Sequence, residues 1–293
     1  MKDFGLLLVD KPVGPTSHHI VHRVRLGSGV RKVGHAGTLD PRASGLLVLC
    51  LGPATRLSEY ISVTSKRYEA VVRFGASTRS YDSDGEIVSR STAIPARAQV
   101  EAALPAFTGE IRQVPPPFSA LKVSGQRAYD LARAGQDVDL EPRPVTIYAL
   151  RLQDYQPPDL TLEVECSAGT YIRSLAHDLG TSLGCGGYLA ALRRTKAGPF
   201  SLEQAISTER LERAFREGTW REHLRPASEA LPGIAHVSLT PDQVDLVRRG
   251  HRIPAAAGSS GMSCGLDADG DLVAVLQAVE GTAEWQPHKV FLE

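Results

Sequence analysis

The run Gly45–Leu51 (GLLVLCL) constrains the fold of this chain more than any other segment, because it is almost entirely apolar. A short apolar run bounded by turn residues predicts a strand that is buried on both faces. Further strands are predicted at 6–9, 68–74, 145–155 and 160–167, and helices at 18–26 (capped by Ser17), 98–107, 127–134 and 171–183. The strands and helices alternate irregularly, and some strands form hairpin-like pairs. This pattern predicts an α+β fold with a mixed, mostly antiparallel sheet and flanking helices.

A second, smaller domain is predicted at the C-terminus. The chain becomes rich in loop residues between Pro226 and Pro232, and short strands broken by glycines follow from about residue 235. We therefore expect residues 1–234 to form one domain and residues 235–293 a small β-rich domain.

The segment that opens this second domain predicts a well-defined helix start. Thr240 is expected at the N-cap, and Gln243, three residues later, completes a capping box. Pro241 suits the first helical position. The flanking Leu239 and Val244 are spaced as a hydrophobic staple.

The charge of the chain is balanced overall but clustered locally. The formal net charge is zero and the pI is about 7.1, so the bulk charge demands no polyanionic partner. Local clusters of basic residues can nevertheless bind phosphate on a neutral protein. Two such clusters are Arg193, Arg194 and Lys196, and Arg248, Arg249, His251 and Arg252. Either cluster is also compatible with an ordinary solvated surface.

The cysteines and the apolar runs indicate the cellular setting. None of the four cysteines belongs to a C-x-x-C pair, which predicts a reduced protein without a cysteine zinc site. No apolar run has transmembrane length, and the N-terminal apolar stretch is too short for a signal peptide. We expect a cytoplasmic location.

Few motifs for cofactors or metals are present. The sequence contains no G-x-G-x-x-G after a strand and no G-x-x-x-x-G-K-[ST], so a nucleotide cofactor is not expected. His18, His19 and His22 could form a metal site on a helix, but no cysteine or carboxylate cluster accompanies them. An exposed or partly packed helix surface is the favoured interpretation, and no metal is expected.

Asp40 is the most informative single residue. It lies in the stretch GHAGTLDPRASG, between Leu39 and Pro41, and leads into the buried strand. An aspartate before a proline is often no more than a turn residue, and spacing alone favours that interpretation. Glycines in this stretch, Gly45 among them, would let the backbone approach a substrate closely, and the strand would support the loop rigidly. These properties suit a catalytic carboxylate.

Six motifs carry a resemblance to a known family. In order over about residues 6–196, they are LLLVDKPVGPTS, GHAGTLDPRASGLLVLCLGPATRLSEY, SKRYEAVVRFG, PPPFSALKVSGQRAYDLARAG, CSAGTYIRSLAHDLG and LGCGGYLAALRRT. The chain resembles the bacterial TruB-type tRNA pseudouridine-55 synthases. The resemblance implies the pseudouridine synthase fold. It also implies that residues 235–293 form an RNA-binding domain of the PUA type, although the match is looser there.

The resemblance assigns three catalytic residues. Asp40 in GTLDP matches the family's nucleophile. Tyr68 in KRY matches the tyrosine that stacks on the target uracil and is a proposed proton acceptor. Arg173 in GTYIR matches the arginine that pairs with the aspartate.

The resemblance also assigns residues that bind the RNA or shape its pocket. His35 matches a histidine that contacts RNA beside the flipped nucleotide, and Tyr171 and Leu192 match pocket residues. Lys11 matches a lysine that supports the active site. Residues 115–143 correspond to a thumb insertion that closes over RNA. Two departures from the family pattern are Phe118, where many members have tyrosine, and the pair His18-His19.

The chemistry of the implied reaction fits these residue types. Converting uridine to pseudouridine breaks the N1–C1′ bond and forms a C5–C1′ bond with no redox change, so no cofactor or metal is expected. The reaction needs a nucleophile and a group that accepts a proton. The nucleotide must also leave its stack to be reached, which calls for an aromatic face and apolar walls. The sequence leaves open whether the aspartate attacks C1′, attacks C6 or enables a glycal route.

The resemblance further implies the partners. The expected substrate is the T stem-loop of tRNA, recognised through its shape and phosphates, which the two basic clusters would contact. We expect a monomer with no membrane association and no obligatory protein partner. Two alternatives remain: an RNA-binding tRNA-folding factor, and a guide-RNA-dependent pseudouridine synthase subunit. The presence of all three catalytic residues favours the enzyme. The bacterial-style motifs and the absence of long basic tails favour a stand-alone one.

Overall fold

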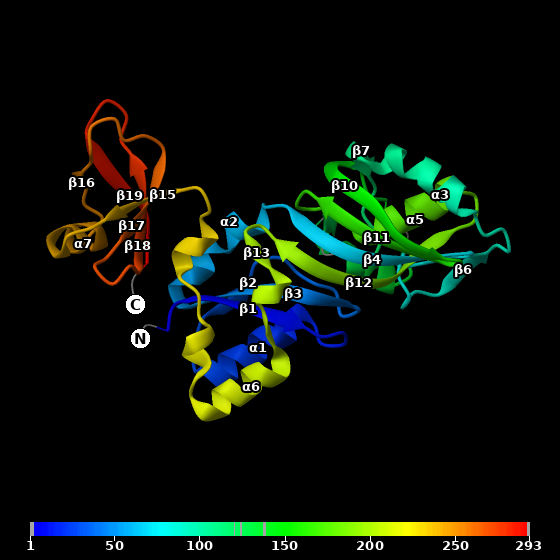
Figure 1. Cartoon of the computed structure of the whole chain (residues 1–293), viewed down its shortest axis with the longest axis horizontal. Helices are drawn as coiled ribbons and strands as arrows, with labels where there is room; N and C mark the ends of the chain where they lie inside the picture. The colour runs from blue at the N-terminus through cyan, green and yellow to red at the C-terminus, as the bar shows by residue number, and fades with distance from the viewer. Residues whose placement is uncertain (1–2, 120, 124, 137–138, 292–293) are drawn as a thin grey trace. The chain divides into compact units, whose positions relative to one another are not determined.

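The computed structural model of the chain describes residues 3–119, 121–123, 125–136 and 139–291. Four residues of the expected thumb insertion (120, 124, 137 and 138) and the last two residues of the expected C-terminal domain lie outside this description. The helices and strands of the chain are drawn in Figure 1. The chain divides into two compact units. Unit 1 comprises Met1–Pro41, Leu46–Ser62 and Pro199–Glu293, and unit 2 comprises Arg42–Gly45 and Val63–Gly198. The expected domain boundary at residue 235 stays a prediction.

The first part of unit 1 contains several strands of the ten-stranded sheet, together with helices. Its elements are β1 (Gly5–Lys11), α1 (Ser17–Ser28), β2 (Val33–His35), β3 (Ala43–Leu51), η1 (Gly52–Leu57), α2 (Ser58–Ser62), β13 (Phe200–Ser201), η3 (Leu202–Gln204), β14 (Ile206–Ser207), α6 (Thr208–Glu217), η4 (Trp220–His223) and η5 (Ala227–Ala230). β1 lies between β14, to which it is parallel, and β3. β2 runs antiparallel to β3. Leu46–Leu51 are completely buried, which confirms the strand predicted from their sequence.

Residues from 235 onward form a separate sheet within unit 1. The elements are β15 (Ala235–Ser238), α7 (Pro241–Arg248), β16 (Ile253–Pro254), β17 (Met262–Leu266), β18 (Leu272–Ala278) and β19 (Glu284–Val290). The strand order is β15-β17-β18-β19-β16, and only the β15–β17 pair is parallel. β19 ends against the first part of unit 1, where the Arg56 guanidinium donates to the Val290 carbonyl oxygen (2.7 Å) and the Phe4 and Phe291 rings stack at 5.9 Å.

The start of α7 confirms the helix cap predicted from sequence. The Thr240 side chain accepts a hydrogen bond from the Gln243 backbone N–H (3.3 Å), and the Gln243 side chain accepts one from the Thr240 N–H (3.0 Å). Leu239 and Val244 are both buried in the same small core, which also contains Trp285. The reciprocal bonds satisfy two N–H groups that the first turn of a helix leaves without partners.

Unit 2 is built on five antiparallel strands, β12, β4, β11, β10 and β7. Its elements are β4 (Lys66–Phe74), β5 (Ala76–Thr78), β6 (Ile87–Arg90), α3 (Arg97–Ala103), η2 (Leu104–Phe107), β7 (Gly109–Gln113), β8 (Lys122–Val123), β9 (Gln126–Arg127), α4 (Ala128–Arg133), β10 (Arg143–Gln156), β11 (Asp159–Cys166), α5 (Ile172–Ser182) and β12 (Gly187–Ala197). The strand order is β12-β4-β11-β10-β7, and every neighbouring pair is antiparallel. The buried side chains of α5 pack against those of this sheet in one hydrophobic core. Figure 1 shows the position of α5 beside these strands.

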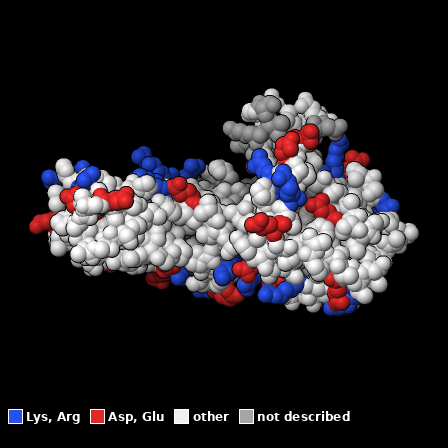
Figure 2. Space-filling view, turned by 90° about the horizontal axis from the view of Figure 1, so that it is seen from above, with Lys and Arg blue, Asp and Glu red and all other residues white. Residues whose placement is uncertain are grey.

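The two units together confirm the expected α+β class with a mixed, mostly antiparallel sheet. The first residues of β3 belong to unit 2 and run parallel to β12, while the rest of β3 belongs to unit 1. Among the described residues, no helix is long and apolar enough to cross a membrane. On the face shown in Figure 2, lysine and arginine side chains lie among aspartate and glutamate side chains, in keeping with the zero net charge.

Candidate active site

The backbone on both sides of Asp40 is fixed by the segment that precedes α1. The Leu39 N–H donates to the Ser17 hydroxyl (2.8 Å), and that hydroxyl donates back to the Leu39 carbonyl oxygen (2.9 Å). The Gly14 N–H donates to the Pro41 carbonyl oxygen (2.8 Å). Asp40 is half-buried between these two anchored neighbours. A carboxylate whose backbone is anchored in this way is well placed for chemistry that requires a defined geometry.

The role of Ser17 differs from the one expected. The cap of α1 is Thr16, whose hydroxyl accepts from the His19 N–H (3.0 Å), and Ser17 is the first residue of the helix. Thr16 and Ser17 are equally suited to capping by residue type. Ser17 is 2 % exposed, and its buried hydroxyl is satisfied by the backbone of Leu39, which leaves the cap to Thr16.

We expect Ser17→Ala to lower the free energy of unfolding by about 1–3 kcal/mol, because it leaves the buried N–H and carbonyl of Leu39 without partners. Thermal or urea unfolding measures the loss. The matched control is Ser58→Ala, which removes one local bond to the Thr55 carbonyl (2.8 Å) and should cost no more than about 0.5 kcal/mol. Equal unfolding free energies for the two variants would contradict the anchoring role of Ser17.

Lys11 stabilises the loop that precedes α1. It is the last residue of β1 and is completely buried. Its Nζ donates to the carbonyl oxygens of Pro12 (2.8 Å) and Pro15 (2.9 Å), so the loop before α1 wraps around the ammonium group. A buried charge requires such hydrogen bonds. The supporting role that the resemblance implies for Lys11 in an active site stays a prediction.

His35 is the last residue of β2 and precedes the loop that contains Asp40. It is half-buried at the end of β2, where it pairs with Leu49 of β3. The next residue, Ala36, donates its N–H to the Val48 carbonyl (2.9 Å). The ladder with β3 therefore fixes the start of the loop that leads to Asp40. The contact of His35 with RNA stays a prediction.

In unit 2, Tyr68 and Leu192 lie on neighbouring strands. In the β4–β12 ladder, Leu192 is opposite Ala70 and Arg194 is opposite Tyr68. Tyr68 and Leu192 are half-buried and pack against the same core. Residues directly opposite each other in an antiparallel pair share a face of the sheet. The structure therefore brings together one aromatic and one aliphatic side chain, the two types expected for the walls of a nucleobase pocket.

The structure gives a reason for the glycine at position 45 that the sequence analysis did not identify. Its φ is +99°, and a Cβ atom there would lie 2.3 Å from the Arg194 carbonyl oxygen. Only glycine allows β3 to approach β12 this closely. The glycine at this position thus serves strand pairing, and approach of its backbone to a substrate stays a prediction.

Arg173 is held by oxygen atoms from two distant segments. It is the second residue of α5 and is 8 % exposed. Its guanidinium donates to the carbonyl oxygens of Ser80 (3.3 Å) and Phe118 (3.1 Å) and lies 3.6 Å from the Asp82 carboxylate. The positive end of a helix dipole is unfavourable for a cation, and these acceptors offset that effect. Because Phe118 contributes its backbone oxygen, this bond does not depend on a tyrosine at that position.

Asp82 is the functional candidate that the sequence analysis did not identify. Its carboxylate accepts from the Ser80 hydroxyl (2.5 Å) and the Asp84 N–H (3.1 Å), besides contacting Arg173. Asp84 in turn forms an ion pair with Arg42, which follows Asp40 by two positions. The stretch YDSDG predicts only a polar turn, and no sequence pattern links it to a helix some ninety residues later.

Tyr171 fixes the N-terminus of α5. Its N–H donates to the Gln113 side-chain oxygen (2.8 Å), and its carbonyl oxygen accepts from the Gln113 side-chain nitrogen (3.0 Å). Gln113 is 2 % exposed and ends β7. The half-buried Tyr171 side chain is thus anchored two residues before Arg173. Its place in a substrate pocket stays a prediction, as does the pairing of Arg173 with Asp40.

The basic clusters differ in their availability to RNA. Arg194 is 1 % exposed, so its expected role as a surface phosphate contact is wrong. Arg193 is half-buried and donates to the Ser44 hydroxyl (3.4 Å). Arg248 and Arg249 are exposed at the end of α7, whereas Arg252 contacts Glu284 (3.2 Å).

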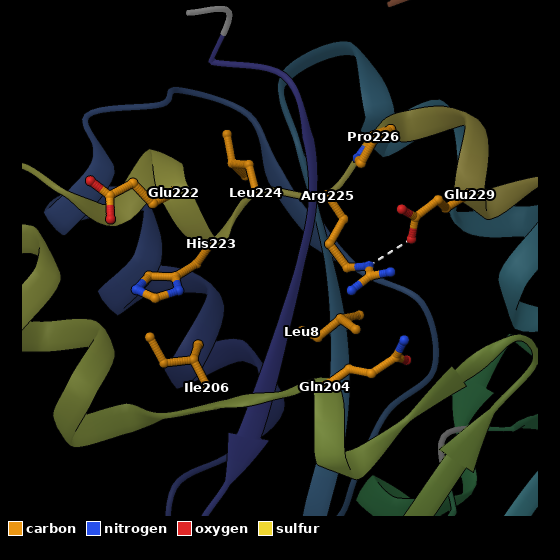
Figure 3. Close-up of a pocket in the computed structure, with 9 residues that line it drawn as sticks. All are labelled: Leu8, Gln204, Ile206, Glu222, His223, Leu224, Arg225, Pro226 and Glu229. Carbon is orange, nitrogen blue, oxygen red and sulfur yellow. Dashed lines mark hydrogen bonds and ion pairs between the residues drawn. The ribbon is translucent and has the colours of Figure 1, made fainter. Parts of the chain in front are cut away.

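Metal sites and pockets are two further features of interest among the residues that the structure describes. Among the described residues, no three His, Cys, Asp or Glu side chains gather as a metal site would require. A pocket of about 330 Å³ occurs in unit 1 (Figure 3). Its lining includes His223, the ion pair between Arg225 and Glu229 (2.6 Å), and Gln204. None of its lining residues is one that the sequence predicts to be functional.

Comparison with known proteins gives a consistent result. Residues 25–172 match the family model described as TruB family pseudouridylate synthase (N terminal domain), and residues 173–232 match the tRNA pseudouridylate synthase B C-terminal domain. The tRNA pseudouridine synthase B of Arthrobacter sp. (strain FB24) is 45% identical over 96% of this chain and 94% of its own length. That of Thermobifida fusca (strain YX) is 44% identical over 98% of both chains. An H/ACA RNP bound to a substrate RNA containing 2′-deoxyuridine contains a chain with a TM-score of 0.74 and 25% identity, covering 99% of this chain and 86% of that one.

Proposed function

The chain belongs to the TruB family of tRNA pseudouridine synthases and is an isomerase, and from that premise we propose that it acts on the uridine at position 55, in the T-loop of tRNA. The observation that carries the proposal is the near-full-length similarity to tRNA pseudouridine synthase B, together with an intact Asp40. The anchored backbone on both sides of Asp40 supports it further.

Each catalytic residue has a chemically suitable role. Asp40 is the nucleophile, acting on the nucleotide as the N1–C1′ bond breaks. The base then turns, C5 bonds to C1′ and loses its proton, and N1 gains one, so the product is an isomer of the substrate. Tyr68 stacks on the uracil and accepts the C5 proton. Arg173 keeps the Asp40 carboxylate ionised, because a nearby cation lowers the pKa of a carboxyl group.

The remaining predicted residues position the nucleotide. A uridine inside a folded tRNA loop must be flipped out before its glycosidic bond can be reached. Leu192 and Tyr171 form walls of the pocket that receives it, and His35 contacts the RNA beside the vacated position. Lys11 acts indirectly, through the loop that anchors Asp40.

A stand-alone enzyme is favoured over a guide-RNA-dependent subunit. The likeness to a chain of the H/ACA RNP is at 25% identity, whereas the tRNA pseudouridine synthase B relatives are at 44% and 45%. The tRNA T stem-loop is therefore the proposed partner. A role confined to RNA folding would not require Asp40, so the Asp40 variants separate it from the enzymatic role.

The proposal is tested by locating pseudouridine in an unmodified tRNA transcript after incubation with the purified chain and no other protein or RNA. Carbodiimide labelling followed by primer extension reads each uridine separately. We expect primer extension to stop at a single new position, the one that corresponds to uridine 55. Modification at other uridines with none at 55, or a requirement for a second RNA, would contradict the proposed substrate.

We propose that the exposed end of α7 contacts RNA phosphates and contributes affinity without chemistry. Arg248→Ala and Arg249→Ala should each lower the slope of log Kd against log salt by about one, while the single-turnover rate at saturating tRNA stays within about twofold. Point variants are preferable to truncation because β19 contacts Arg56. The control is Arg97→Ala, an exposed arginine that pairs with Glu101 (2.8 Å). Equal slopes for all three variants would show that these arginines are merely solvated.

A further inference from the structure

The turn beside Arg173 contains an unusual backbone conformation. Tyr81 has a φ of 64°, and it is the only non-glycine residue with a positive φ among the residues that the structure describes. A side chain with a Cβ atom disfavours this left-handed region, and a bulky one does so most. Such a conformation persists only where surrounding contacts enforce it, and it is often found at functional sites.

The contacts that enforce it come from α5 and β12. The Tyr81 ring stacks on the His177 ring, with centroids 3.8 Å apart and planes inclined by 9°. The Tyr81 carbonyl oxygen accepts from the Leu189 N–H (2.9 Å). Burial lowers the pKa of His177 below its ordinary value, so the stacked imidazole is neutral at neutral pH. The ring contact and the strand contact act on the same residue from two sides.

The same turn supplies the oxygen atoms around Arg173. Ser80 and Asp82, the two neighbours of Tyr81, provide a carbonyl oxygen (3.3 Å) and a carboxylate (3.6 Å) to the guanidinium. His177 follows Arg173 by four positions, so both lie on one face of α5. One turn of helix therefore makes two contacts with the loop, the ring stack and the guanidinium cluster.

We propose that the Tyr81–His177 stack is a positioning device that fixes the 80–82 turn, so that Ser80 and Asp82 orient the Arg173 guanidinium. This inference rests on the proposed function, because it assumes that Arg173 acts in catalysis. Neither Tyr81 nor His177 touches the substrate in this account. Both act through the geometry of Arg173.

A purely structural role for Tyr81 makes the opposite prediction. Glycine adopts a φ of 64° without strain, so Tyr81→Gly would then relieve the backbone, lose the ring contact and change stability only, and would leave catalysis unchanged. If the ring positions Arg173, the same substitution should slow catalysis even though it relieves the backbone. The glycine variant therefore distinguishes the two accounts.

The experiment measures the single-turnover rate at saturating tRNA, the Kd for tRNA and the thermal midpoint in the full chain. We expect Tyr81→Gly to lower the rate about tenfold, equivalent to about 1.4 kcal/mol in the barrier, with Kd unchanged within about twofold. Tyr81→Phe and His177→Phe keep a stacked ring and should stay within about twofold of wild type. His177→Leu removes the stack from the helix side and should resemble Tyr81→Gly, which provides the test should the glycine variant not fold.

The pathway through Asp82 is tested by a double-mutant cycle. In an Asp82→Asn background, adding Tyr81→Gly should slow the reaction by a further factor of less than about two. The carboxylate that the stack positions is already absent from that background. Full additivity of the two substitutions would overturn the proposal, and so would a wild-type rate for Tyr81→Gly.

The control for general destabilisation is Tyr155→Leu. Tyr155 is buried and packs edge-to-face on Phe74 (6.2 Å), also in unit 2. It should lower the thermal midpoint without changing the single-turnover rate. Equal slowing by Tyr155→Leu and Tyr81→Gly would overturn the positioning role. A wild-type chain that forms no pseudouridine at position 55 would instead refute the proposed function, so the two failures are distinguishable.

Discussion

Asp40→Asn is expected to lower the single-turnover rate of pseudouridine formation by at least roughly 10⁴-fold, the scale of loss seen when a nucleophile is removed. The amide has nearly the same shape as the carboxylate but cannot serve as an anionic nucleophile. The fold should persist, because the bonds from Ser17 and Gly14 hold the backbone of Leu39 and Pro41 and do not involve the Asp40 side chain.

The measurement is the rate with excess protein over tRNA, accompanied by the Kd for tRNA, which should change by less than about threefold because many other groups bind the RNA. Asp159→Asn is the matched control. It makes the same chemical change in a half-buried carboxylate that receives two bonds from Arg73 (2.6 Å each). Loss of activity in both variants would indicate a general effect of removing a carboxylate, not a nucleophile at Asp40.

Replacing Arg173 is expected to produce the second largest effect, a loss of roughly 10³-fold for Arg173→Ala, in the range found when a preorganised electrostatic group is removed. The substitution removes a guanidinium that is 8 % exposed and leaves the Asp82 carboxylate without its cation. Removing one member of a buried ion pair costs about 3–5 kcal/mol in stability, so thermal unfolding must be measured alongside activity.

Arg173→Lys separates charge from geometry. Lysine keeps the cation but cannot reproduce the planar fork that reaches Ser80, Phe118 and Asp82 together. We expect a loss of roughly 10- to 100-fold, with Arg73→Lys as the exposed control at near wild-type rate.

The pH dependence provides an independent check on Arg173. A carboxyl group that loses a neighbouring cation has a higher pKa, so the Asp40 nucleophile would be protonated over a wider range of acidic pH. The acid limb of the pH–rate profile of Arg173→Ala should therefore move to higher pH. An unchanged profile would contradict the pairing of Arg173 with Asp40.

Features encoded locally were predicted well from sequence. The apolar run of β3, the capping box at Thr240 and the hairpin of β10 and β11 depend on residues close together in the chain, and the structure confirms each of them. The cap of α1 was assigned to the wrong neighbour because Thr16 and Ser17 have equivalent side chains. Only the long-range bonds to Leu39 distinguish them.

Features that depend on distant segments were missed. Asp82 is a candidate only because the fold places its turn against α5, ninety-one positions further along the chain. Arg194 looked like a surface cation from its place in a basic cluster, but strand pairing opposite Tyr68 and Gly45 buries it. Hydrophobic periodicity gives no register between strands, so neither result was accessible from sequence.

The central claim, that this chain isomerises uridine 55 of tRNA through Asp40, is tested most directly by tritium release from a tRNA transcript labelled at C5 of its uridines. C5 must lose its hydrogen when it bonds to C1′, so the released tritium counts the reaction itself. The account predicts that the wild-type chain releases one tritium per tRNA, and that none is released from a transcript with cytidine at position 55 or by Asp40→Asn. Release from the cytidine-55 transcript, or near wild-type release by Asp40→Asn, would contradict it.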